Sequence, residues 1–221
     1  ADRPLPEEWE PRADAITYYG DIQEAEAFGR LVYLTGRQRG AHRAEELVFV
    51  ADGAKWIWNL VEEHFPHAVQ IVDWYHATEY IWDVAHAAHG EGSDRAQEWA
   101  AARLGELWHG DFEDVLRAFR AHVTPEWDDD PARQAINYYQ NNRHRMRYPE
   151  FRDQGYQIGS GTIESGCKRV IGARLKQAGM TWTVDGARRV IKARALHLSG
   201  EWDDFCNHRP PPRRTYSRCV A

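Results

Sequence analysis

The sequence has no long apolar run and few cysteines. No stretch approaches the roughly 20 apolar residues that a membrane-spanning helix needs. The first residues also lack the basic region and apolar core of an export signal. The three cysteines, Cys167, Cys206 and Cys219, form no CxxC pair, which argues for a reducing compartment and against a structural zinc ribbon. We therefore expect a soluble, cytoplasmic protein that has no membrane partner.

Charge is distributed unevenly along the 221 residues, whose net charge is −6. Residues 1–132 carry 11 Lys and Arg against 27 Asp and Glu, whereas residues 133–221 carry 17 against 7. A basic C-terminal part suits a polyanion-binding face, because each phosphate that it pairs releases condensed counterions. The alternative is two solvated faces that neutralise each other within the fold.

Two short apolar runs rich in β-forming residues, residues 46–51 and 68–72, flank a predicted helix over residues 55–64. A strand, a helix and a strand with short links predict a parallel pair joined by a right-handed crossover. An aspartate follows each run, Asp52 after the first and Asp73 after the second. Open α/β sheets bind ligands at this carboxyl end of their strands.

Composition and apolar spacing predict how the whole chain is divided. A strand at 15–19 and a helix capped by Asp21 are expected before the two runs, and basic helices over 163–178 and 186–198 follow a glycine-rich loop. The expected parts are an extended lead-in (1–14), a strand–helix–strand portion (15–77), a helical insertion (78–150), a part with the basic helices (151–208) and a disordered basic tail (209–221).

Three carboxylates have positions that suit metal binding. Asp52 and Asp73 end neighbouring strands, and Glu164 opens a helix. Hard cations such as Mg²⁺ prefer oxygen ligands, and phosphoryl transfer uses them to stabilise the attacking and leaving oxygens. Aspartates at strand ends also serve as helix caps or turn formers, so residue types alone leave both interpretations open.

Four segments together carry a family resemblance. They are VADGAKWIWNL (50–60), FPHAVQIVDWYH (65–76), RMRYPEFR (145–152) and IGSGTIESGCKRVIGARLKQAGM (158–180). The chain closely resembles the ISKra group of insertion-sequence transposases from about residue 15 to residue 208. That group belongs to the Mutator-like DDE enzymes, which have a ribonuclease H-like core.

The resemblance implies an α/β fold: a partial ribonuclease H-like sheet, with a large all-helical insertion between the second catalytic aspartate and the glutamate. It implies Asp52 and Glu164 as catalytic residues and ligands of Mg²⁺ or Mn²⁺. Asp73 and His76 match the family's C/D-x-x-H pair, either as catalytic residues or in a structural hydrogen bond. The implied reaction is metal-dependent cleavage and strand transfer of DNA.

The first aspartate of the family's triad lies in an earlier strand. The candidates ahead of Asp52 are Asp2, Asp14 and Asp21, and none lies in an apolar strand followed by two more. The chain also begins at Ala1 rather than methionine. We therefore expect a fragment that is inactive alone. The alternative is a non-catalytic, DNA-binding remnant of a transposase.

The basic helices carry the expected DNA contacts, with transposon ends and target DNA as partners, a homo-oligomer in the synaptic complex, and association with the bacterial nucleoid. Trp182 is the candidate for stacking on a displaced base. The candidates for phosphate contacts are Lys168, Arg169, Arg174, Lys176, Arg188, Arg189, Lys192 and Arg194. Lys168 has an alternative partner in Glu164, four residues before it.

Two further features have mainly structural interpretations. His76, Glu79, His86 and His89 are candidates for a zinc cluster in an unrelated metallohydrolase, but their spacing favours a solvated helix face. Cys167 shares apolar spacing with Val170 and Ile171, which predicts that it lies in the core.

Overall fold

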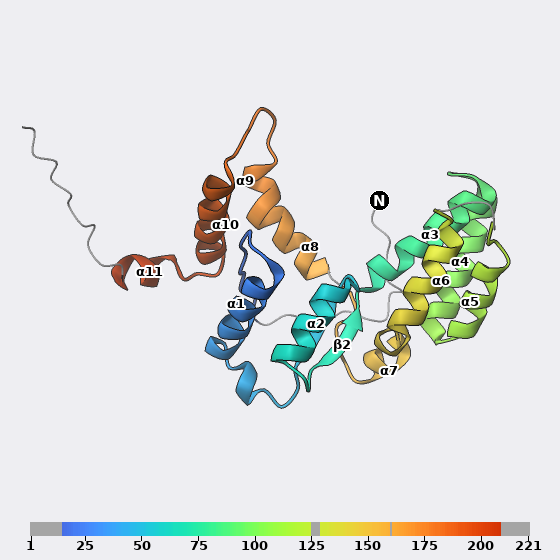
Figure 1. Ribbon diagram of the computed structural model, residues 1–221, viewed down its shortest axis with the longest axis horizontal. Helices are drawn as coiled ribbons and strands as arrows, with labels where there is room; N and C mark the ends of the chain where they lie inside the picture. Colours follow the sequence, from blue (N-terminus) through green and yellow to red (C-terminus); the bar gives the residue numbers. More distant parts are fainter. Residues whose placement is uncertain (1–14, 125–128, 160, 209–221) are drawn as a thin grey trace, which may run out of the picture. The chain divides into compact units, whose positions relative to one another are not determined.

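A computed structural model describes residues 15–124, 129–159 and 161–208, apart from the side chain at position 162 (Figure 1). The described chain forms two compact units. The first comprises residues 23–164, and the second comprises residues 15–22 together with residues 165–208. The parts expected at residues 1–14 and 209–221 lie outside the described residues.

The first unit is built on a parallel pair of strands, as predicted. β1 (Val48–Ala51) and β2 (Val69–Val72) pair in the register Val48 opposite Val69 to Ala51 opposite Val72. The connection between them is α2 (Lys55–His64), whose bounds match the prediction, and α1 (Ala25–Gln38) packs on α2. The sheet has two strands within the described residues, so the protein is α/β but mostly helical.

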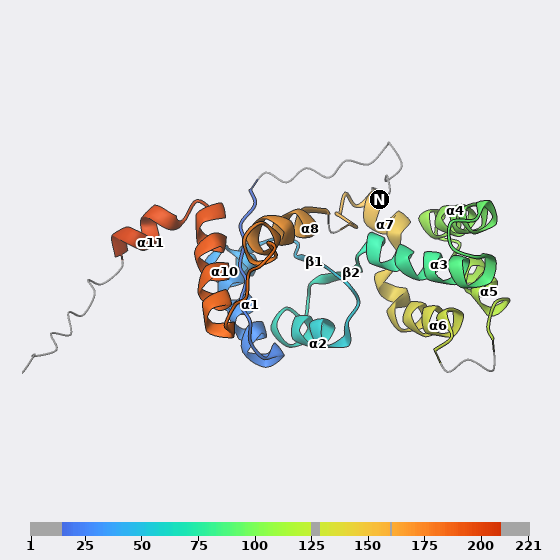
Figure 2. The ribbon, with the colours of Figure 1, turned by 90° about the horizontal axis from the view of Figure 1, so that it is seen from above.

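The rest of this unit is a layer of helices around a shared apolar core (Figure 2). Its largest fully buried side chains include Phe119, Tyr139 and Tyr148. Asp130 caps the helix that begins at Pro131, because its carboxylate accepts the N–H of Ala132 at 2.8 Å. Proline suits this first helical position, where no N–H is needed. The helices are α3 (Trp74–His89), α4 (Asp94–His109), α5 (Phe112–Arg120), α6 (Pro131–Asn142), the 3₁₀ turn η2 (Arg143–Arg145) and α7 (Tyr148–Asp153).

The segment RMRYPEFR joins this helical layer to the sheet. Arg145 is buried and donates hydrogen bonds to Gln70 of β2 at 2.7 Å and Glu62 of α2 at 3.3 Å. Its guanidinium also lies 4.7 Å from the ring centre of Trp58. The Tyr148 hydroxyl donates to a carbonyl of β2 at 3.1 Å. The residues that carry part of the family resemblance therefore hold the sheet against the helices.

The second unit contains the basic helices, whose positions are much as predicted. The predicted helix over 163–178 is α8 (Gly161–Cys167), which begins in the first unit, then the π-helical η3 (Lys168–Gly172) and α9 (Ala173–Leu175). α10 (Val184–Leu198) and α11 (Trp202–His208) follow. Cys167 is exposed, so its prediction as a core residue is wrong. The helix widens to π geometry after Cys167, which breaks the apolar spacing with Val170.

Residues 15–22 belong to this second unit and form no strand, so the predicted strand at 15–19 is wrong. Their partner is a helix end: the backbone N–H of Tyr18 donates to the Ser199 hydroxyl at 2.8 Å. Asp21 does not cap α1, whose N-cap is Glu24. None of the helices in the described ranges is long and apolar enough to cross a membrane.

Candidate active site

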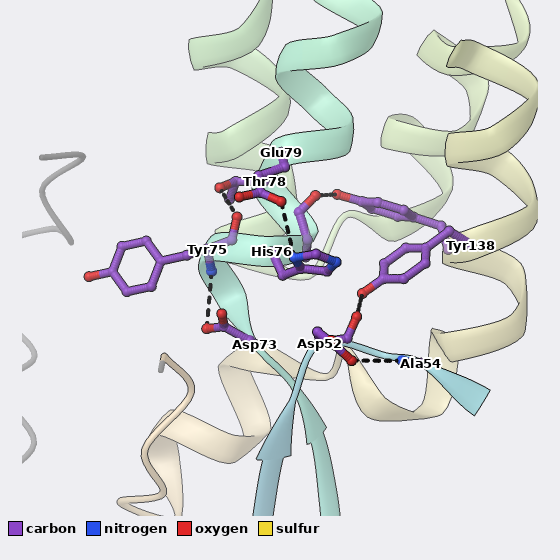
Figure 3. Close-up of polar contacts among 10 residues, drawn as sticks. Asp52, Ala54, Asp73, Tyr75, His76, Thr78, Glu79 and Tyr138 are labelled. Atoms are coloured by element: carbon purple, nitrogen blue, oxygen red, sulfur yellow. Dashed lines mark hydrogen bonds and ion pairs between the residues drawn. The ribbon is translucent and has the colours of Figure 1, made fainter. Parts of the chain in front are cut away.

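The two strand-end aspartates lie at the same end of the strand pair (Figure 3). Ala51 is opposite Val72 in the register, so Asp52 and Asp73 both leave the sheet at its carboxyl end. The N–H of Asp73 donates to the carbonyl of Ala51 at 2.7 Å, which continues the pairing to this point. The prediction that the two aspartates are neighbours is confirmed.

Asp52 is exposed and lies in a tight turn. Its carboxylate accepts the N–H of Ala54 at 2.9 Å, and its backbone carbonyl accepts the Tyr138 hydroxyl at 2.7 Å. Between them, Gly53 has a φ of +86°, a value that favours glycine. The turn therefore has a defined backbone while its carboxylate faces solvent.

Asp73 is 6% exposed and caps α3, because its carboxylate accepts the N–H of Tyr75 at 3.3 Å. A carboxylate at a helix N-terminus satisfies a free N–H and interacts favourably with the helix dipole. This contact gives Asp73 a structural role at the strand end. Asp52 is the more accessible of the two carboxylates.

His76 faces Glu79 of its own helix, with its Nδ1 atom 3.0 Å from a Glu79 carboxylate oxygen (Figure 3). The rings of Tyr80 and Tyr138 lie edge-on to the imidazole, each with its centre 6.1 Å away. Further along α3, the His89 ring meets His122 edge-on, with the ring centres 5.1 Å apart. Across residues 15–124, 129–159 and 161–208, no three His, Cys, Asp or Glu side chains are grouped so that they could hold a metal ion, so the zinc cluster has no support.

Nearby carboxylates raise the pKa of two tyrosines at the site. Burial raises the pKa of Tyr138, and negative charge on Asp52 and Asp73 raises it further. Burial likewise raises the pKa of Tyr75, with additional contributions from Asp73 and then Glu164. Negative charge on Asp73 thus raises the pKa of both tyrosines, together with Asp52 at Tyr138 and with Glu164 at Tyr75. Both phenols stay neutral at physiological pH and can donate hydrogen bonds.

The loop before Glu164 is attached to the start of α3. The carbonyl of Ile158 accepts the N–H of Trp74 at 2.8 Å. The next residue, Gly159, lies against Tyr75, and a side chain added there would meet the ring at 3.0 Å. Glu164 itself is exposed in the first turn of α8. Oxygen donors of this kind suit Mg²⁺. Asp52 and Glu164 are not part of a complete metal-ligand set within the described residues.

Within the second unit, Asp21 neutralises part of the predicted DNA-binding face. Its carboxylate lies 3.0 Å from the Arg188 guanidinium and 2.8 Å from the Lys192 ammonium, and its side chain is 1% exposed. Burial would raise the pKa of Asp21, but the hydrogen bonds from the two cations outweigh it and hold the pKa at about 2. Arg188 and Lys192 thus pair with a carboxylate of their own unit.

The other predicted DNA contacts fall into two groups. Arg189 pairs with Asp185 at 2.5 Å, and Arg194 donates to the carbonyls of Val170, at 2.9 Å, and Arg169. The Arg169 guanidinium lies 5.8 Å from the ring centre of Tyr18. The remaining four are exposed: Lys168, Arg174, Lys176 and Trp182. Arg169 and Arg189 are exposed as well, and the Arg189 side chain is 80% exposed despite its pair with Asp185, so these two residues and the four above form the accessible part of the predicted face.

Sequence reasoning missed Tyr138 and Tyr75 beside the strand ends, the pairing of Glu79 with His76, and the pairing of Asp21 with two cations of the second unit. Two of these contacts join segments far apart in the sequence: Tyr138 is 86 residues from Asp52, and Asp21 is 167 residues from Arg188. One local signal was present: glycine directly after a strand-end aspartate indicates a turn with positive φ. His76 and Glu79, three residues apart on a helix, also had the spacing of a side-chain pair.

A family model matches residues 23–205, which is most of the chain, and the protein belongs to that family, the uncharacterised protein family UPF0236. No curated protein and no solved structure matched the chain.

Proposed function

We propose that the protein is the catalytic portion of a DDE-type DNA transposase of the ISKra group, with a ribonuclease H-like core, that cleaves DNA and transfers the cut strand. The observation that carries the proposal is the strand end, where Asp52 and Asp73 leave neighbouring parallel strands. The loop to Glu164 is attached at the same place, to the first turn of the helix that Asp73 caps.

In this proposal Asp52 and Glu164 hold Mg²⁺ or Mn²⁺. Both residues are exposed, so a cation can reach their carboxylate oxygens. When bound, such a cation offsets the charge that develops on the phosphoryl oxygens. Asp73 fixes the start of α3 through its cap on Tyr75, and His76, paired with Glu79, is available for proton transfer beside the carboxylates. A third carboxylate is required, and residues 15–47, which lie ahead of β1, contain no strand to carry it.

The proposed partner is DNA, both the transposon ends and the target, with the transposase acting as a homo-oligomer in the synaptic complex. The second unit supports this proposal through exposed cations near the turn from α9 to α10, chiefly Arg174 and Lys176. Trp182 is 40% exposed between the same two helices, which suits stacking on an unpaired base. Phosphate contacts of this kind supply affinity but little sequence information.

A second candidate is a DNA-binding protein that does not cut DNA. The observation that favours it is the lack, within the described ranges, of three side chains grouped to hold a metal ion. The two candidates share the basic second unit, so DNA binding does not distinguish between them. Strand cleavage does.

The test is a nicking assay on DNA that carries the element's ends, with the protein expressed alone and with any coding sequence that precedes it in its gene. We expect nicking by the extended protein in Mg²⁺ or Mn²⁺ and its loss in Asp52→Asn and Glu164→Gln. Asp114→Asn, which changes a carboxylate paired with Arg117 in α5, is the matched control and should nick normally. Tight binding without nicking in both forms would favour the second candidate, and nicking that persists in Glu164→Gln would contradict the first.

A further inference from the structure

The turn that presents Asp52 is held by a side chain from the helical layer. The Tyr138 hydroxyl of α6 donates to the Asp52 carbonyl at 2.7 Å (Figure 3). The same ring covers Gly53 so closely that an added Cβ would lie 2.5 Å from the hydroxyl oxygen and 2.8 Å from a ring carbon. The contact therefore fixes both the carbonyl and the glycine of the turn.

The Tyr138 ring is itself held in place by α3. Tyr80 stacks on it with a centroid distance of 4.1 Å and an interplanar angle of 20°, and His76 meets it edge-on. Aromatic pairs of this kind stabilise a ring beyond the area that they bury. Asp73 caps the same helix α3 at the neighbouring strand end.

We infer that Tyr138 is a positioning residue for Asp52: it sets the direction of the Asp52 carboxylate by clamping the turn over residues 52–54. The inference rests on the proposed function, in which Asp52 is a metal ligand. The hydroxyl reaches the backbone of Asp52 and leaves the carboxylate free of Tyr138, so Tyr138 would act on metal affinity through geometry alone. The helical layer would then be part of the active site rather than an appendage to the sheet.

The test compares two neighbouring tyrosines of α6. Tyr138→Phe removes the hydroxyl that reaches Asp52. Tyr139→Phe is the matched control, because that hydroxyl also donates to a backbone carbonyl, that of Ala77 at 2.9 Å, but at a fully buried position away from the turn. The two readouts are amide hydrogen exchange over residues 52–54 and binding of Mn²⁺ alone, measured by titration.

We expect Tyr138→Phe to speed exchange at Gly53 and Ala54 and to weaken Mn²⁺ binding, each by about five-fold, which is the effect of losing one hydrogen bond. Tyr139→Phe should leave both unchanged and lower the melting temperature more. Wild-type exchange in Tyr138→Phe would overturn the inference, and so would an equal local change in Tyr139→Phe. If wild-type protein binds no Mn²⁺ while Tyr138→Phe still loosens the turn, the positioning role stands and the proposed metal site fails.

Discussion

Asp21 should stabilise the second unit in a pH-dependent way, because it is a buried carboxylate between two cations. Its pKa falls from an ordinary value of 3.8 to about 2. At about 1.4 kcal/mol for each pKa unit, the ionised carboxylate would contribute about 2 kcal/mol. Arg188 and Lys192 are 37% and 47% exposed, and solvent screening lowers our expected contribution to about 1–2 kcal/mol.

The change to make is Asp21→Asn, which keeps the shape and removes the charge. A group whose pKa is depressed by folding stabilises the protein above its unfolded pKa, and this contribution is lost as the pH falls through the folded value. The difference in stability between wild type and variant should therefore be full at pH 7, about half as large at pH 3, small near pH 2 and gone near pH 1. The chemistry predicts loss of stability in acid, not in base.

The assay is hydrogen exchange of the α10 amides, corrected for the intrinsic pH dependence of exchange, because it reports the opening free energy of this unit separately. Asp185→Asn is the control: it removes the partner of Arg189 in a pair whose side chains are 80% and 68% exposed, and it should have little effect. An Asp21→Asn difference that stays constant from pH 3 to pH 7 would refute the argument, because the carboxylate would then act through shape alone.

Three further predictions concern the first unit and DNA. Gly53→Ala should destabilise the protein by more than about 1 kcal/mol in urea unfolding, because its φ of +86° is unfavourable for alanine and Tyr138 leaves no room for a Cβ. Arg145→Ala should cost about 2–3 kcal/mol in the same assay, because it leaves the buried Asn142 and the half-buried Gln70 without their hydrogen-bond donor. Reversing the charge of Arg174 and Lys176 together should reduce the slope of log K against log salt for DNA by about 2, and an unchanged slope would show that these residues do not contact phosphate.

The strand pair was predictable because its signals are local. Each strand is a short run of β-forming residues that ends at an aspartate, and the helix between them has the bounds that its sequence predicts. The register then brings Asp52 and Asp73 together without further information. Local pattern failed at residues 15–19, because Ser199, the hydrogen-bond partner of Tyr18, is 181 residues away.

The candidate site was predictable only in its carboxylates. Tyr138 lies in a helix whose own pattern indicates only an apolar face, and nothing near it in sequence points to Asp52. Asp21 was interpreted as a helix cap because aspartates commonly occupy that position, but its two cations come from α10. Cys167 was misplaced because apolar spacing assumes a continuous α-helix, which the π-helical turn interrupts.

If Asp52 and Glu164 bind one cation as proposed, paramagnetic broadening by Mn²⁺ should appear near both residues. Amide signals of Gly53 and Ser165, which neighbour the two carboxylates in sequence, would be followed during a Mn²⁺ titration. We expect both signals to broaden over the same concentration range, and we expect Asp52→Asn and Glu164→Gln each to weaken the broadening at both positions. If Asp52→Asn left the broadening at Ser165 intact, or Glu164→Gln left the broadening at Gly53 intact, the two carboxylates would belong to separate sites and the proposed shared cation would be wrong.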